Sequence, residues 1–166
     1  MYGTILVVDD NDDVRETTRM ILSRQGYEVW PAPDGNSAIQ LMNQPVLANE
    51  VCTVVCDLIM KNGDGTDLIA YLRKYHPTVP IVICSGADDT AFLQGVLQDG
   101  VCDWMRKPVS RETLVQKVRT AIHLFTLRKQ QDRYQESAQT PVSSQAEVFR
   151  SEMESGQTCR NRSAEG

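Results

Sequence analysis

Four apolar runs of the sequence are each followed closely by side chains that could take part in polar chemistry. In chain order, these side chains are Asp9 with Asp10, then Asp57, Ser85 and Lys107. If they met in one place, the three carboxylates could not all stay ionised without a compensating cation. An all-oxygen acidic cluster suits Mg²⁺, which keeps several waters and leaves positions for phosphate oxygens. The residue types therefore indicate a magnesium site that handles phosphate.

The remaining residues would have complementary roles at such a site. Lys107 would pair with a carboxylate at rest and with a phosphoryl oxygen during reaction. The Ser85 hydroxyl and free backbone N–H groups could hold another phosphoryl oxygen. Asp57 would be the nucleophile. Together these residues predict the transfer of a phosphoryl group to a carboxylate.

Each of these residues also has an ordinary structural explanation. An aspartate after a strand can cap a helix or a turn, a serine before a glycine can be a turn residue, and a lysine can simply be solvated. The functional interpretation depends on their joint occurrence at the ends of four strands.

The elements that must position these residues follow from the apolar pattern. Residues 51–57 read Val-Cys-Thr-Val-Val-Cys-Asp, which is typical of a strand buried on both faces. Strands are predicted over residues 5–8, 27–30, 51–57, 80–84 and 101–105. Apolar residues at helical spacing fall within residues 14–22, 38–42, 68–72, 92–97 and 114–125. Residues 31–35 are expected to turn the chain, and Pro45 is expected to end the second helix.

This alternation of strands and helices predicts an α/β fold. A repeated strand–helix pattern is typical of a parallel sheet with helices on both faces, a three-layer sandwich with right-handed crossovers. The carboxyl ends of the strands are where such sheets place their ligands. The candidate residues would therefore lie together at that edge.

Composition limits the expected partners and compartment. The net charge of −5 gives no indication of direct binding to nucleic acid or to a membrane. The five cysteines show no CxxC spacing, which favours free, buried thiols in a reducing compartment. No apolar run reaches the ~18 residues of a membrane helix, and no signal-peptide pattern opens the chain. We therefore expect a cytoplasmic protein.

The apolar periodicity ends after Leu127. We expect residues 1–127 to form one domain, and residues 128–166 to extend the last helix and then become a mostly disordered tail. Residues 142–153 differ, because they combine a capping box with apolar residues on one helical face. A plain tail, a short partner-binding helix and the start of an output module all remain open.

Residues 1–127 resemble the receiver domain of two-component response regulators. The matching motifs are the acidic pair Asp9-Asp10, the phosphoacceptor loop from Asp57 to Gly65, the switch position Ser85-Gly86 and the pair Lys107-Pro108. The resemblance implies a flavodoxin-like, five-stranded sheet of order 2-1-3-4-5 with five helices, and a cis peptide before Pro108.

The resemblance also implies a function. A histidine kinase or a histidine phosphotransfer protein would pass a phosphoryl group to Asp57 with the help of Mg²⁺. The metal would be held by Asp9, Asp10, Asp57 and the backbone carbonyl of Ile59. Ser85 and Trp104 would then switch the face formed by helix 4, strand 5 and helix 5 for a downstream protein. Such a chain is a signalling phosphoacceptor and not an enzyme in the ordinary sense.

Several residues depart from the usual pattern of this family. Lys61 stands where proline is usual and Gly63 where methionine is common, so the loop is expected to be more mobile. Trp104 replaces the usual Tyr or Phe of the switch. Ile59 and Ala87, which would flank the phosphoryl group, cannot orient a hydrolytic water. We therefore expect slow hydrolysis of the acyl phosphate.

Two other interpretations fit the sequence less well. A haloacid-dehalogenase-like phosphatase also uses an aspartate nucleophile and Mg²⁺, but its DxDxT pattern needs a threonine that residues 10–14 lack. Residues 128–166 are too short and too weakly basic for a DNA-binding domain. The chain is therefore either a stand-alone receiver or the receiver module of a larger regulator whose effector domain is absent.

Overall fold

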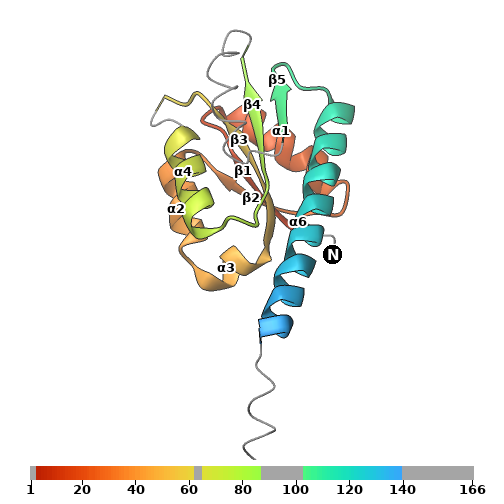
Figure 1. The fold of residues 1–166 in the computed structure, drawn as a ribbon. Coiled ribbons are helices and arrows are strands. Elements are labelled where there is room, and N and C mark those ends of the chain that lie inside the picture. The colour runs from red at the N-terminus through yellow and green to blue at the C-terminus, as the bar shows by residue number, and fades with distance from the viewer. Residues whose placement is uncertain (1–2, 62–64, 87–102, 140–166) are drawn as a thin grey trace, which may run out of the picture. The chain divides into compact units, whose positions relative to one another are not determined.

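The computed structural model describes residues 3–61, 65–86 and 103–139 (Figure 1). The chain divides into two compact units, Met1–Lys129 and Gln130–Gly166. The first unit contains a five-stranded sheet of order β2-β1-β3-β4-β5 in which every neighbouring pair is parallel. The predicted α/β class and strand order are confirmed.

Burial differs between the central and the edge strands. The strands are β1 (Thr4–Val8), β2 (Glu28–Ala32), β3 (Val51–Asp57), β4 (Ile81–Ser85) and β5 (Asp103–Arg106). Every residue of β1, β3 and β4 is buried, whereas β2 and β5 at the sheet edges are partly exposed. The turn predicted over residues 31–35 begins later than expected, because β2 continues through Pro31 to Ala32. An edge strand tolerates proline, since a missing N–H there need not break the ladder.

The described residues contain five helices, one of which was not predicted. They are α1 (Asp12–Ser23), α2 (Gly35–Met42), α3 (Pro45–Glu50), α4 (Gly65–Tyr75) and α6 (Arg111–Gln139). Pro45, expected to end a helix, instead begins α3, where its missing N–H would have had no helical partner. The helix predicted around residues 92–97 lies outside the described residues.

Helices cover both faces of the sheet, as Figure 1 shows, with α2 and α4 on one face and α1 and α6 on the other. Leu6 of β1 belongs to the core beneath α2 and α4, with Leu68. Ile5, its neighbour in β1, belongs to the opposite core with Leu22 and Val118. Successive residues of a strand point to opposite faces, so a strand covered on both sides is apolar throughout. The predicted three-layer sandwich is confirmed.

The described cysteines, Cys52, Cys56 and Cys84, are free and buried, as expected. Burial raises the pKa of the Cys52 thiol to about 11 and that of Cys84 to about 12, so both are protonated at neutral pH. Among the described residues, no helix is long and apolar enough to cross a membrane.

The last helix, α6, continues as far as Gln139. The division predicted at residue 127, with a mostly disordered tail, stays a prediction. Residues 140–166, including the capping box and the apolar face noted in the sequence, lie outside the described residues.

Candidate functional site

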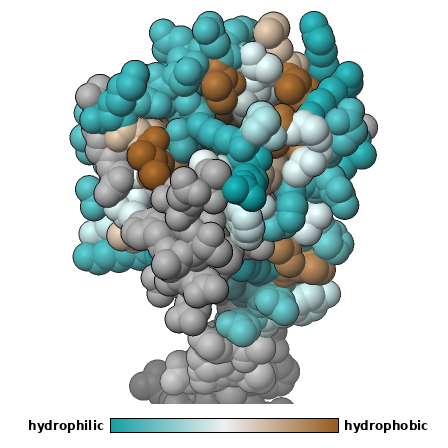
Figure 2. Space-filling model, turned by 90° about the horizontal axis from the view of Figure 1, so that it is seen from above, coloured by the Kyte–Doolittle hydropathy of each residue, from teal (hydrophilic) through white to brown (hydrophobic). Residues whose placement is uncertain are grey.

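The candidate residues gather where the parallel strands end. Asp9 and Asp10 follow β1, Asp57 and Ser85 are the last residues of β3 and β4, and Lys107 follows β5. Figure 2 views the molecule from this end, where the visible surface is mostly hydrophilic with separate hydrophobic groups. The sheet therefore brings together side chains that are up to 98 positions apart in the sequence.

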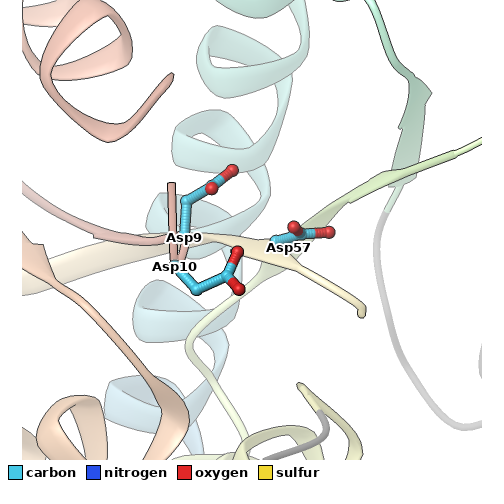
Figure 3. Close-up of side chains that lie close together, drawn as sticks. All are labelled: Asp9, Asp10 and Asp57. Atoms are coloured by element: carbon cyan, nitrogen blue, oxygen red, sulfur yellow. The ribbon is translucent and has the colours of Figure 1, made fainter. Parts of the chain in front are cut away.

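Three carboxylates form a compact cluster at this edge (Figure 3). One oxygen of each of Asp9, Asp10 and Asp57 lies within 4.8 Å of the other two. Asp9 and Asp57 are only 4% and 7% exposed, whereas Asp10 is partly exposed. Carboxylates this close and this buried repel one another, so the cluster favours a compensating cation.

The ammonium group of Lys107 supplies part of that compensation. Its Nζ lies 2.7 Å from Oδ2 of Asp57 and 2.9 Å from Oδ2 of Asp9. Its backbone N–H donates to the carbonyl of Ser85 over 2.8 Å, which joins the end of β5 to the end of β4. The predicted cis peptide between Lys107 and Pro108 is present.

The environment shifts the pKa of both partners in this ion pair. Burial raises the pKa of Asp57 above its ordinary value, and Lys107 offsets this only in part. Burial also acts to lower the pKa of Lys107, but hydrogen bonds and charges from Asp57 and Asp9 outweigh it, so the pKa is raised. The lysine therefore stays cationic, while the carboxylate is costly to ionise without a further positive charge.

The loop after β3 contacts the Asp57 carboxylate through its backbone. The N–H of Ile59 donates to Oδ1 of Asp57 over 3.3 Å, and the Ile59 side chain is 59% exposed. The N–H of Gly65, the first residue of α4, donates to the carbonyl of Leu58 over 3.0 Å. The predicted use of the Ile59 carbonyl as a metal ligand stays a prediction.

Two contacts of the acidic residues were missed in the sequence. The backbone N–H of Lys61 donates to Oδ2 of Asp10 over 2.9 Å, and the guanidinium of Arg15 donates to the carbonyl of Asp9 over 2.7 Å. The sequence did contain a sign of the Lys61 contact. A lysine stands where proline is usual in the family, and only a residue other than proline has the backbone N–H that donates. We find no sequence signal for Arg15. The mobility predicted for the loop stays a prediction, since residues 62–64 lie outside the described part.

The two predicted switch residues occupy neighbouring strands. Ser85 is fully buried, and its hydroxyl donates to the carbonyl of Gly86 over 3.4 Å. Trp104 lies in β5 opposite Ile83 of β4 and is 36% exposed. Their roles as switches stay predictions, and Ala87 lies outside the described residues.

A cavity of about 590 Å³ adjoins the acidic cluster. Asp9, Asp57 and Lys107 form part of its lining, together with side chains of α1 and Leu114 of α6. The cavity therefore adjoins Asp57, but Asp10 and Ser85 do not line it.

Comparison with known proteins identifies the family. Residues 5–119 match the family model of the response regulator receiver domain. The chain belongs to this family, which accounts for both its sheet and its acidic edge. The likeness implied by the sequence motifs is thus confirmed, and the match gives no support to a haloacid-dehalogenase-like phosphatase.

Individual relatives and structures agree with this assignment. The chain is 34% identical to the sensor kinase CckA of Brucella abortus over 70% of its own length and 12% of the kinase. It is 33% identical to the response regulator MprA of Mycolicibacterium vanbaalenii over 74% of its length and 51% of that regulator. The chain therefore spans about half or less of these two relatives.

Two solved structures extend the comparison to the fold. The receiver domain of NtrX from Brucella abortus matches with a TM-score of 0.66 and 30% identity, covering 72% of this chain and 98% of that one. A response regulator receiver domain protein from Clostridium thermocellum shares the fold, with a TM-score of 0.71, 24% identity and coverage of 75% and 98%.

Proposed function

We propose that this chain is a phosphoacceptor, in which Asp57 takes a phosphoryl group from a phosphohistidine. The observation that carries the proposal is the position of the Lys107 ammonium, 2.7 Å from Asp57 and 2.9 Å from Asp9, beside a third carboxylate. A histidine kinase or a histidine phosphotransfer protein is the donor expected for a receiver domain.

The transfer exchanges one bond to phosphorus for another. A carboxylate oxygen of Asp57 attacks the phosphorus, the phosphorus–nitrogen bond of the phosphohistidine breaks, and the imidazole nitrogen leaves with the electron pair. Lys107 exchanges its contact with the Asp57 carboxylate for one with a phosphoryl oxygen. The Ser85 hydroxyl, at the end of the adjacent β4, binds another phosphoryl oxygen.

The donor set fits Mg²⁺. Three carboxylates face one ammonium group, which leaves the cluster with excess negative charge and oxygen ligands of the kind that Mg²⁺ prefers. Asp9, Asp10, Asp57 and the carbonyl of Ile59 would hold the ion. When bound, it would neutralise charge on the phosphoryl oxygens.

The phosphorylated chain would pass on its signal by binding another protein. Trp104, partly exposed on the edge strand β5, would respond to the engagement of Ser85 and change the surface around β5 and its neighbouring helices. A downstream protein, and not nucleic acid or a membrane, would bind there, and the chain would signal without turning over a substrate. The cytoplasmic location expected from the sequence stays a prediction.

A second candidate is a receiver module within a larger regulator. It is supported by the comparison with MprA, of which the matched part is only 51%. In that case the same phosphoacceptor chemistry would act on an effector domain of the longer protein.

Uptake of phosphate tests the proposal. The protein is incubated with Mg²⁺ and a small phosphoramidate, and its intact mass is measured. We expect one added phosphoryl group, which is lost when EDTA removes the metal and absent in Asp57→Asn. Full incorporation by Asp57→Asn, or no incorporation by the wild-type chain with any small donor or phosphohistidine protein, would contradict the proposal.

A further inference from the structure

The hydrogen bond between Lys61 and Asp10 joins two loops across the acidic cluster. The donor is the backbone N–H of Lys61 in the β3–α4 loop, and the acceptor is Oδ2 of Asp10, just after β1. The two atoms are 2.9 Å apart, although the residues are 51 positions apart in the chain. The contact therefore depends on the tertiary structure and not on a local turn.

The three carboxylates of the cluster are held in different ways. Lys107 forms ion pairs with Asp9 and Asp57. Among the ion pairs of the described residues, none joins Lys107 to Asp10. Asp10 instead accepts a hydrogen bond from the Lys61 amide, which is a neutral donor. This donor fixes the direction of the carboxylate without cancelling its charge.

We propose that the Lys61 backbone N–H is a positioning group for the divalent cation of this site, an inference that rests on the proposed function. By donating to Oδ2 it orients the Asp10 carboxylate within the cluster. A ligand already held in its binding orientation loses less conformational freedom when the metal enters. Hydrogen bonds that orient metal ligands typically change metal affinity in this way.

This chain has the backbone donor because residue 61 departs from the usual pattern of the family. Proline, which is usual at this position, has no N–H and could not make the contact. The lysine side chain is not needed for it, since any other residue supplies the same backbone donor. Substitutions at residue 61 can therefore separate the donor from the positive charge.

The test compares Lys61→Ala with Lys61→Pro. Both lack the ammonium group, but only the alanine variant keeps the N–H. Each metal-free protein is titrated with MgCl₂ while its backbone amide NMR shifts are followed. We expect Lys61→Ala to bind Mg²⁺ at least as tightly as the wild type, and Lys61→Pro to bind roughly three- to tenfold more weakly than Lys61→Ala. Equal or tighter binding by Lys61→Pro would overturn the proposal.

Amide hydrogen exchange provides a second measurement that needs no metal. In the metal-free wild type, the Lys61 amide should exchange more slowly than in Asp10→Ala, which lacks the acceptor. Equal exchange in the two proteins would overturn the positioning role even if Lys61→Pro failed to fold.

The measurements distinguish a failure of the proposed function from a failure of the positioning role. If the wild-type chain bound no Mg²⁺, the proposed function and the positioning role would both fail. If it bound Mg²⁺ but the alanine and proline variants bound it equally, only the positioning role would be wrong.

Discussion

At the scale of single residues, the site depends on a charge imbalance around Lys107. Its ammonium group lies close to Asp9 and Asp57, and Asp10 adds a third carboxylate within 4.8 Å. One positive charge cannot compensate three negative charges in a partly buried cluster. The proposed binding of a divalent cation would supply the missing positive charge, and it would leave Lys107 available for a phosphoryl oxygen.

The raised pKa of Asp57 predicts how the stability of the metal-free chain depends on pH. Its stabilising contribution is fully present below the ordinary aspartate pKa and is lost as the pH rises through the raised folded-state pKa. Across that window, the wild type should therefore lose stability relative to Asp57→Asn as the pH rises. Urea unfolding of both proteins in EDTA at a series of pH values measures this. A stability difference that is constant, or that changes in the opposite direction, would count against the burial of Asp57.

The side chain of Ile59 should affect how fast the phosphorylated state hydrolyses. The backbone N–H of Ile59 contacts Asp57, and its exposed, apolar side chain cannot hydrogen-bond an attacking water. Replacing it by asparagine should speed hydrolysis by roughly three- to tenfold, less than full general-base catalysis would give. Ile59→Val, which stays apolar, serves as the control and should leave the rate unchanged. Decay of the phosphorylated protein is followed by intact mass, and a wild-type half-life of seconds would contradict the expected slow hydrolysis.

At the scale of elements, the site requires α4 to begin directly against the end of β3. A Cβ at Gly65 would lie 2.6 Å from the carbonyl oxygen of Asp57 and 3.2 Å from Sγ of Cys56. The first contact is with backbone, so the end of β3 that carries Asp57 would have to shift. Glycine at this position allows helix and strand to approach.

We therefore expect Gly65→Ala to lower the free energy of unfolding by about 1–3 kcal/mol, as overpacking does. Gly86→Ala is the matched control, because among the described residues, apart from its chain neighbours, no heavy atom lies within 4 Å of a Cβ there. Urea unfolding of both variants measures the difference. Equal free energies of unfolding for the two variants would show that the end of β3 can shift without loss of stability.

The sequence predicted the strands far better than the contacts between loops. The apolar run 51–57 identified β3 because a strand covered on both faces has no polar side. The helix α3 was missed because six residues show too little periodicity, and its initial proline suggested an end instead of a start. The Lys61–Asp10 contact was missed because its donor is a backbone group, which side-chain patterns do not reveal.

At the scale of the whole molecule, the acidic edge should couple folding to metal binding. An ion that binds only the folded chain stabilises it, by about 1.4 kcal/mol when its concentration is ten times its Kd. We expect Mg²⁺ to raise the Tm of the wild type, and to raise that of Asp10→Asn by less, since this variant loses one charged ligand. Thermal unfolding in Mg²⁺ and in EDTA gives the comparison. An identical Mg²⁺ effect on both proteins would mean that the ion binds elsewhere.

The central claim is that Asp57 is the phosphoacceptor, and trapping its acyl phosphate tests this most directly. The chain is phosphorylated in Mg²⁺, reduced with borohydride, which converts an aspartyl phosphate to homoserine, and then digested and sequenced by mass spectrometry. The account predicts homoserine at position 57 and unchanged aspartates at positions 9 and 10. An unmodified Asp57, with homoserine at another aspartate or phosphate retained on Ser85, would contradict it.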